Sequence, residues 1–208
     1  MNYTDIVDMA LSYSDREDDE VTTRMDKFIQ IVESRINKKL KTSDMSARAS
    51  IDLTTADVDQ QIFALPPDYG GLRSIKIVGD EQRTLTYVNP EQLSNRISKG
   101  TSGLIGSRVY YNIIGKELHL YPPSNVGSLE ITYYQKVPTL TSGAPNNWIS
   151  DDNPEVYIFG ILVEISSFTK DLDAVKVWAV RFDSCIDDVQ VDDTETRWSG
   201  TPLQIHVG

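Results

Sequence analysis

Few residues in this sequence could carry nucleophilic catalysis. The chain has one cysteine, Cys185, and two histidines, His119 and His206. A nucleophile needs a base beside it, but His119 lies in a run of alternating polar and apolar residues and His206 lies near the C-terminus. Cys185 falls on an apolar stripe, which favours a small buried residue over a reactive thiol. With no Gly-x-Ser-x-Gly elbow either, the sequence gives no indication of an enzyme.

Three acidic pairs raise the question of a metal site: Asp151-Asp152, Asp187-Asp188 and Asp192-Asp193. Hard cations prefer several carboxylates, but the calcium-loop pattern with its central glycine and final glutamate is missing. Helix capping accounts for the first pair and a solvated helix face for the other two. We expect neither a metal nor another cofactor. A carboxylate pair for glycoside hydrolysis stays open, because nothing in the sequence singles out one pair.

A glycine repeat offers another candidate contact. Gly100, Gly103 and Gly106 form Gly-x-x-Gly-x-x-Gly. No Gly-Lys-Ser/Thr follows and we expect no βαβ unit around it, so it is neither a P-loop nor a dinucleotide fingerprint. We interpret it as a loop tip whose residues Gly103, Leu104 and Ile105 contact a neighbouring protein.

Aromatic residues indicate possible contact surfaces. Each of the pairs Tyr110-Tyr111 and Tyr133-Tyr134 places one ring on either face of a strand. One ring must pack on a core, and the other is exposed or covered by a partner, for which tyrosine is favoured. Tyr111, Tyr134 and Trp148 are therefore candidate contact residues. Ordinary two-sided packing is the alternative for the tyrosines.

Helices must position both ends of the chain. Asn2 or Thr4 can cap a first helix, and apolar residues at steps of three and four from Val21 to Leu40 predict a single second helix. The stretch from Val156 to Phe168 is apolar almost all round, which predicts a buried helix. The stripe of the last predicted helix is Leu172, Val175, Trp178, Phe182, Cys185, Ile186 and Val189. The opposite face of that helix is acidic.

The middle of the chain changes to a period of two, which is typical of strands. Strand-like runs occupy residues 47–53, 62–65, 72–78, 84–88, 108–114, 117–121 and 128–137, and Asn89-Pro90 starts one short helix. For 208 residues, one large domain or a domain with an insertion is expected. We predict an α+β fold: a helical bundle from residues 1–46 and 142–199, an inserted antiparallel β-rich module at 47–141, and a C-terminal tail at 200–208.

Charge and hydropathy limit the partners. The net charge is −11, and nearly all the excess acid lies in residues 151–208. Gripping a phosphate backbone needs clustered lysine and arginine, so a duplex-DNA clamp is not expected, whereas an acidic face that repels DNA is compatible. The longest apolar run, Val156 to Val163, is far too short to span a bilayer, and no signal peptide is visible. We expect the chain to stay in the cytosol where it is made, without membrane contact.

An ordered series of motifs resembles a known family. The series is Leu65-Pro66-Pro67-Asp68-Tyr69, then Leu118 to Pro123, Ile131 to Pro138, Asn146 to Ile149 and Asn153 to Gly160. Over roughly residues 20–190 it is similar to the head-to-tail adaptor proteins of tailed bacteriophages, especially those with short tails.

The resemblance implies a structural protein of the virion neck, assembled in the host cytoplasm. Members combine a helical bundle with a β-rich insertion and are not enzymes. They form a ring, usually of twelve copies, under the portal protein, where genomic DNA passes through the channel without specific binding and nozzle or tail proteins attach below. Their C-terminal segments commonly dock onto the portal, which here implicates Pro202, Leu203, Ile205 and Val207.

Three alternatives remain at the level of sequence. The protein could be another neck or tail-completion component. The β-rich module could be a carbohydrate-binding or hydrolytic unit with Trp148 in a sugar platform. The C-terminal tail could pack on its own subunit instead of the portal.

Overall fold

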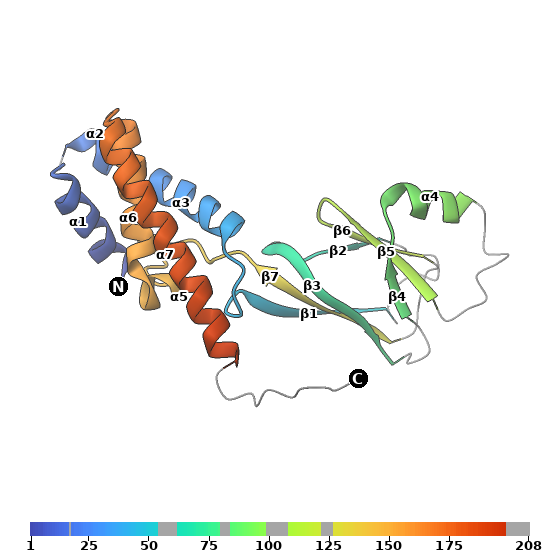
Figure 1. The fold of residues 1–208 in the computed structure, drawn as a ribbon. Coiled ribbons are helices and arrows are strands. Elements are labelled where there is room, and N and C mark those ends of the chain that lie inside the picture. Colours follow the sequence, from blue (N-terminus) through green and yellow to red (C-terminus); the bar gives the residue numbers. More distant parts are fainter. Residues whose placement is uncertain (17, 54–61, 80–83, 99–107, 122–126, 199–208) are drawn as a thin grey trace. The chain divides into compact units, whose positions relative to one another are not determined.

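The computed structural model describes residues 1–16, 18–53, 62–79, 84–98, 108–121 and 127–198 (Figure 1). The fold is α+β, as predicted. The chain divides into two compact units, which we call the helical unit (Met1–Asp44 with Val137–Gly208) and the β unit (Met45–Lys136).

The helical unit begins with three helices. These are α1 (Tyr3–Ser14), α2 (Asp19–Thr22) and α3 (Met25–Lys39). Asn2 caps α1 through a reciprocal bond with Asp5, which satisfies two otherwise unpaired backbone donors. The predicted single helix from Val21 to Leu40 is wrong in one respect, because the chain leaves helical geometry between α2 and α3. The adjacent β-branched residues Thr22 and Thr23 are weak helix formers.

Three helices complete this unit: α5 (Trp148–Asp152), α6 (Pro154–Phe168) and α7 (Leu172–Trp198). Helix α6 contacts α1, α3, α5 and α7, which confirms that this apolar segment is buried on several sides. Gly160 makes the close approach possible, because a Cβ there would lie 2.6 Å from Val32 Cγ1 on α3 and 3.1 Å from Phe182 Cε2 on α7.

The predicted stripe of α7 is correct in its middle and wrong at its start. Phe182, Ile186 and Val189 are buried, but Leu172 is 69% exposed. Leu172 is the first residue of α7, directly after a turn in which Lys170 has a φ of 62°. Its side chain therefore lies beyond the region where α7 packs on the other helices.

The described part of the β unit contains two sheets. The three-stranded sheet has the order β1 (Ser46–Asp52), β7 (Ser128–Gln135), β3 (Tyr69–Val78) and is antiparallel. The four-stranded sheet has the order β2 (Ile62–Ala64), β6 (Glu117–Tyr121), β5 (Arg108–Ile114), β4 (Thr84–Tyr87). Their shared core is Leu53, Phe63, Leu65, Val109, Leu118, Leu120, Leu129, Ile131 and Tyr133.

One connection corrects the expectation of a purely antiparallel module. Strands β4 and β5 pair in parallel, because the helix α4 (Pro90–Ser98) lies between them in the chain and a crossover returns the chain in the same direction. A βαβ arrangement therefore flanks the glycine repeat, contrary to prediction. The repeat follows the helix, whereas a phosphate-binding loop precedes one.

Candidate functional site

A carboxyl and a phenol lie together inside the helical unit. Glu33 is 5% exposed and Tyr157 is fully buried. Glu33 Oε1 accepts hydrogen bonds from the Leu140 N–H at 2.6 Å and the Tyr157 hydroxyl at 3.3 Å. Asn147 Nδ2 donates to the Tyr157 hydroxyl at 2.8 Å. Loss of hydration on burial raises the pKa of Glu33 and that of Tyr157.

This cluster anchors a chain segment and leaves no open acid or base. One helical turn from Glu33, Asn37 Oδ1 accepts a hydrogen bond from the Val137 N–H at 2.9 Å. Two side chains of α3 thus hold the backbone where it returns from the β unit. Because the groups bond to one another and are closed to solvent, they stabilise the fold and present no reacting atom to a substrate.

The cysteine and the acidic residues form no reactive centre in the described structure. Burial raises the pKa of the Cys185 thiol, and the nearby Glu155 and Asp188 add to that shift, so the thiol stays protonated at neutral pH. Among the described residues, no group of three His, Cys, Asp or Glu side chains could hold a metal ion.

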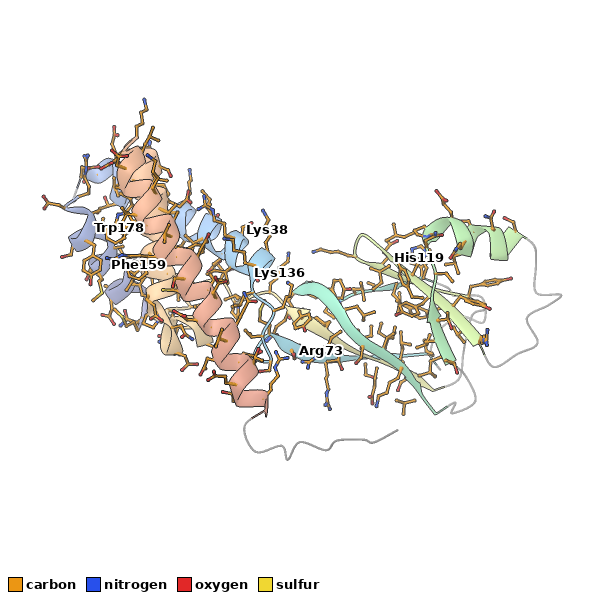
Figure 2. All side chains as sticks on the ribbon, viewed as in Figure 1. Lys38, Arg73, His119, Lys136, Phe159 and Trp178 are labelled. Carbon is orange, nitrogen blue, oxygen red and sulfur yellow. The ribbon has the colours of Figure 1, made fainter. Side chains whose placement is uncertain are left out.

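His119 lies on β6 opposite Asn112 of β5 (Figure 2). Its Nε2 atom is 3.6 Å from Glu117 Oε2, which is too long for a hydrogen bond. Nε2 of His119 and Oδ1 of Asn112 are both buried without a hydrogen-bond partner. Nothing in the described residues orients this ring as a general base needs.

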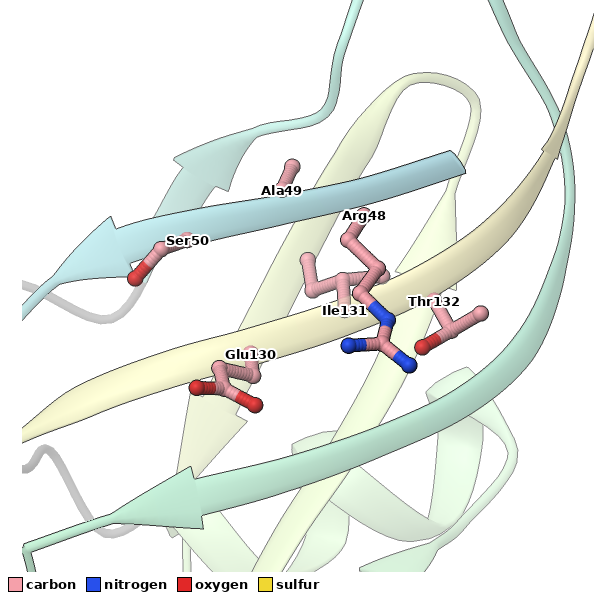
Figure 3. A pocket seen from close by; sticks show the side chains of 6 residues that line it. All are labelled: Arg48, Ala49, Ser50, Glu130, Ile131 and Thr132. Atoms are coloured by element: carbon pink, nitrogen blue, oxygen red, sulfur yellow. The ribbon is translucent and has the colours of Figure 1, made fainter. Parts of the chain in front are cut away.

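The outer face of the three-stranded sheet carries two guanidinium groups. Arg48 on β1 lines a pocket of about 220 Å³ with Ser50, Glu130 and Thr132 (Figure 3), and its side chain extends across β7 beside Thr132. Arg73 lies at an irregularity of β3, between Leu72 and Ser74 in the register.

Arg73 connects the three strands of this sheet. Its Nη1 atom donates to the Ser46 hydroxyl at 2.5 Å, and its guanidinium lies 5.9 Å from the centre of the Tyr134 ring. No carboxylate in the described part of the chain pairs with either Arg48 or Arg73. Glu130, the carboxylate on this face, pairs instead with Lys76, with 2.7 Å between Glu130 Oε2 and Lys76 Nζ. We call this surface the sheet face; it comprises Ser46, Arg48, Ser50, Arg73, Lys76, Glu130, Thr132 and Tyr134.

A second surface lies on the solvent side of α7. Val177, Val180 and Val191 are 53%, 71% and 55% exposed and lie on one side of the helix at steps of three and eleven residues. The exposed carboxylates Asp187, Asp188, Asp192 and Glu195 accompany them. These seven residues with Ser184 are called the α7 face. Exposed apolar side chains bordered by charges are typical of protein contacts.

The excess acid belongs to the helical unit. This unit has 22 acidic and 11 basic residues, a net charge of −11, whereas the β unit has nine of each and is neutral. The sheet face and the α7 face therefore lie on parts of the chain with different electrostatic character. None of the helices described is long and apolar enough to cross a membrane.

The predicted aromatic contacts divide between core and surface. Tyr111 packs partly against the core of the β unit, and its ring meets that of Tyr87 edge-on at 5.6 Å. Tyr134 lies half-buried on the sheet face beside Arg73. Trp148 begins α5, and its Nε1 atom is buried without a hydrogen-bond partner. Tyr111 and Tyr134 thus lie in the β unit, and Trp148 lies in the helical unit.

The remaining predicted contacts lie outside the described residues. They are Gly103, Leu104 and Ile105 in the glycine repeat, and Pro202, Leu203, Ile205 and Val207 in the tail.

Sequence reasoning missed Arg48 and Arg73 as surface features. The alternation Ser46-Ala47-Arg48-Ala49-Ser50 places Arg48 on the polar face of β1 and was available as a signal. Arg73 offered none, since its outward position depends on the irregular pairing of β3 with β7.

Comparison with known proteins identifies the family. A family model described as the SU10 adaptor protein matches residues 1–205. No curated protein shows significant similarity to the sequence. The predicted resemblance to phage head-to-tail adaptors is confirmed by the family match. Since that match covers nearly the whole chain, this protein belongs to the SU10 adaptor protein family, a family of structural head-to-tail adaptors of bacteriophages.

Proposed function

We propose that copies of this chain form a ring under the portal protein, extend the DNA channel and provide the platform to which nozzle or tail proteins attach. The observation that carries the proposal is the family match over residues 1–205. Membership of an adaptor family implies association with portal and tail components and a position at the virion neck.

The charge distribution supports a conduit for DNA. A net charge of −11 concentrated in the helical unit repels the phosphate backbone, and repetition around a ring multiplies that repulsion. Passing DNA then meets few cations that could hold it. We expect the isolated chain to be monomeric or weakly associated, with the ring closing on its portal template.

Binding to the portal tests this function directly. Purified chain mixed with assembled portal rings should co-purify with them, and cryo-microscopy should show added density at one end of the portal. Failure of the intact chain to bind its portal in both measurements would refute the proposal.

The C-terminal tail is the proposed portal-docking segment. Deleting Thr201–Gly208 should reduce the occupancy of the portal, and so should serine at the apolar positions Leu203, Ile205 and Val207. Alanine at the alternating polar positions Gln204 and His206 is the matched control and should leave occupancy unchanged. Equal occupancy for all these variants would assign docking to another part of the chain.

A further inference from the structure

We propose that the sheet face of one copy binds the α7 face of a second copy, and that this contact links neighbours in the assembly. The inference rests on the ring proposed above and adds to it a pair of surfaces and the residues that join them. Its occupant is a second copy of this chain.

Charge complementarity is the first argument. The guanidinium groups of Arg48 and Arg73 pair with no carboxylate among the described residues of their own copy. On the α7 face, Asp187, Asp188 and Asp192 are exposed, and no basic side chain pairs with them in the structure described. Arg181 lies on the same side of α7, but its guanidinium lies over the rings of Phe159 and Trp178. Arginine binds carboxylates through paired hydrogen bonds, so Arg48 and Arg73 complement these three carboxylates of the α7 face.

The dimensions of the two faces agree. From Val177 to Glu195 the helix rises about 27 Å at 1.5 Å per residue. The seven residues of β1, Ser46–Asp52, extend about 23 Å, and three strands about 4.8 Å apart form a bed about 10 Å wide, close to the diameter of a helix. The exposed valines of α7 would then lie over Ser50 and Thr132, whose small side chains permit a helix to approach.

The size of this contact explains why the isolated chain should associate weakly. A helix covering about 27 Å by 10 Å buries near 300 Å² on each partner, well below the roughly 800 Å² of a standard stable interface. Because the two faces differ, the contact is head-to-tail, and its repetition gives a closed ring or an open filament. Closure on a template supplies the stability that a single contact lacks.

Nucleic acid is the less suitable occupant of the sheet face. Phosphate binding needs clustered cations, whereas Glu130 lies among those of this face and already pairs with Lys76. The β unit is neutral, so it has no net positive charge that would attract a polyanion. A protein surface that alternates carboxylates with apolar side chains fits better.

Disulfide trapping in the full-length chain, without portal, tests the contact even when it is weak. One variant carries Ser50→Cys and a second carries Ser184→Cys, each with Cys185→Ala so that no native thiol competes. Under mild oxidation of the mixture, we expect the mixed 50–184 disulfide to form several-fold faster than the disulfide with a control variant, Ser12→Cys on α1. Mass spectrometry of the linked peptides identifies the products.

Charge reversal adds specificity to the test. Arg48→Glu with Arg73→Glu in the first chain should reduce trapping to the control level, and Asp187→Lys with Asp188→Lys in the second chain should restore it. High salt should weaken trapping by the wild-type faces. Circular dichroism of each variant verifies that these exposed substitutions leave the fold intact.

Four outcomes would overturn the inference. Trapping at the control level, or trapping that charge reversal does not change, would show that the two faces do not bind each other. In a chain that carries both Ser50→Cys and Ser184→Cys, efficient formation of an internal disulfide, with no disulfide between separate chains, would place the contact within one copy. Binding of a short DNA duplex that is lost with Arg48→Glu and Arg73→Glu would assign the sheet face to nucleic acid. Because the trapping experiment contains no portal, trapping can succeed where portal binding fails, and portal binding can succeed where trapping fails. The two proposals are therefore tested separately.

Discussion

Removing the buried carboxyl of Glu33 should destabilise the helical unit strongly. In Glu33→Ala the Leu140 N–H loses its 2.6 Å acceptor and the Tyr157 hydroxyl loses an acceptor at 3.3 Å. A buried group left unsatisfied costs about 1–3 kcal/mol. Two such groups, less the relief from no longer burying a carboxylate, give about 2–4 kcal/mol, or roughly 5–15 °C in Tm for a chain of this size.

Glu33→Gln separates the charge from the hydrogen bonds. Glutamine retains an acceptor oxygen, so we expect it to cost about 1 kcal/mol, the typical net value of one hydrogen bond. The pKa of Glu33 is raised in the folded state. Its contribution is therefore complete below its unfolded pKa of about 4.3 and declines as pH rises through the folded pKa. The difference in free energy of unfolding between wild type and Glu33→Gln should therefore decrease as pH rises from the unfolded pKa through the folded pKa.

The assay is denaturant unfolding followed by circular dichroism at 222 nm at a series of pH values. Gln30→Ala, at an exposed position of the same helix, is the control and should change the free energy of unfolding by less than about 0.5 kcal/mol. Equal losses for alanine and glutamine at position 33, or a difference between wild type and Glu33→Gln that increases with pH, would refute the reasoning.

Two further substitutions test the packing of the helical unit by the same unfolding assay. Gly160→Val should cost about 1–3 kcal/mol or more by overpacking, because a Cβ there meets Val32 Cγ1 at 2.6 Å. Gly143→Val, where the nearest atom lies at 4.0 Å, should be nearly neutral, and equal effects would contradict the close approach of the helices. Asp193→Asn should cost about 1–3 kcal/mol at neutral pH. Burial acts to raise the pKa of Asp193, but its hydrogen bonds from the Ser43 hydroxyl and N–H help to lower it overall. That stability is present above the unfolded pKa of about 3.9 and is lost as pH falls through the folded pKa, so a loss that persisted at low pH would contradict the ionic role.

Local pattern alone was sufficient for most elements. The apolar positions Met25, Ile29 and Ile36 repeat at helical spacing and are buried in the structure, because the side of a helix on which a residue lies follows from its place in the repeat. The predicted strands at 108–114 and 117–121 are confirmed as β5 and β6, which pair antiparallel around a tight turn. Gly115 in this turn has a φ of 62°, which glycine adopts without steric cost.

For the tyrosine pairs, local pattern could not predict which rings are covered by other elements. Alternation places Tyr110 and Tyr111 on opposite faces of β5, but it could not show that helix α4 covers the first face, where Tyr110 packs with Val88, Leu93 and Tyr121. Both faces of this strand are therefore occupied within the β unit. The same pattern places Tyr134 on the sheet face, where it pairs with Ser46 of β1 in the register.

The sequence by itself determined the α+β class, the repeating helical and strand patterns and the family of this protein, because each depends on the order of neighbouring residues. Only the tertiary structure decided that β4 pairs with β5 in parallel, that Glu33 holds the returning backbone at Leu140, and that Arg48 and Arg73 share one face. These features join residues from separate segments of the chain. Their energies depend on distances and burial that exist only once those segments have packed together.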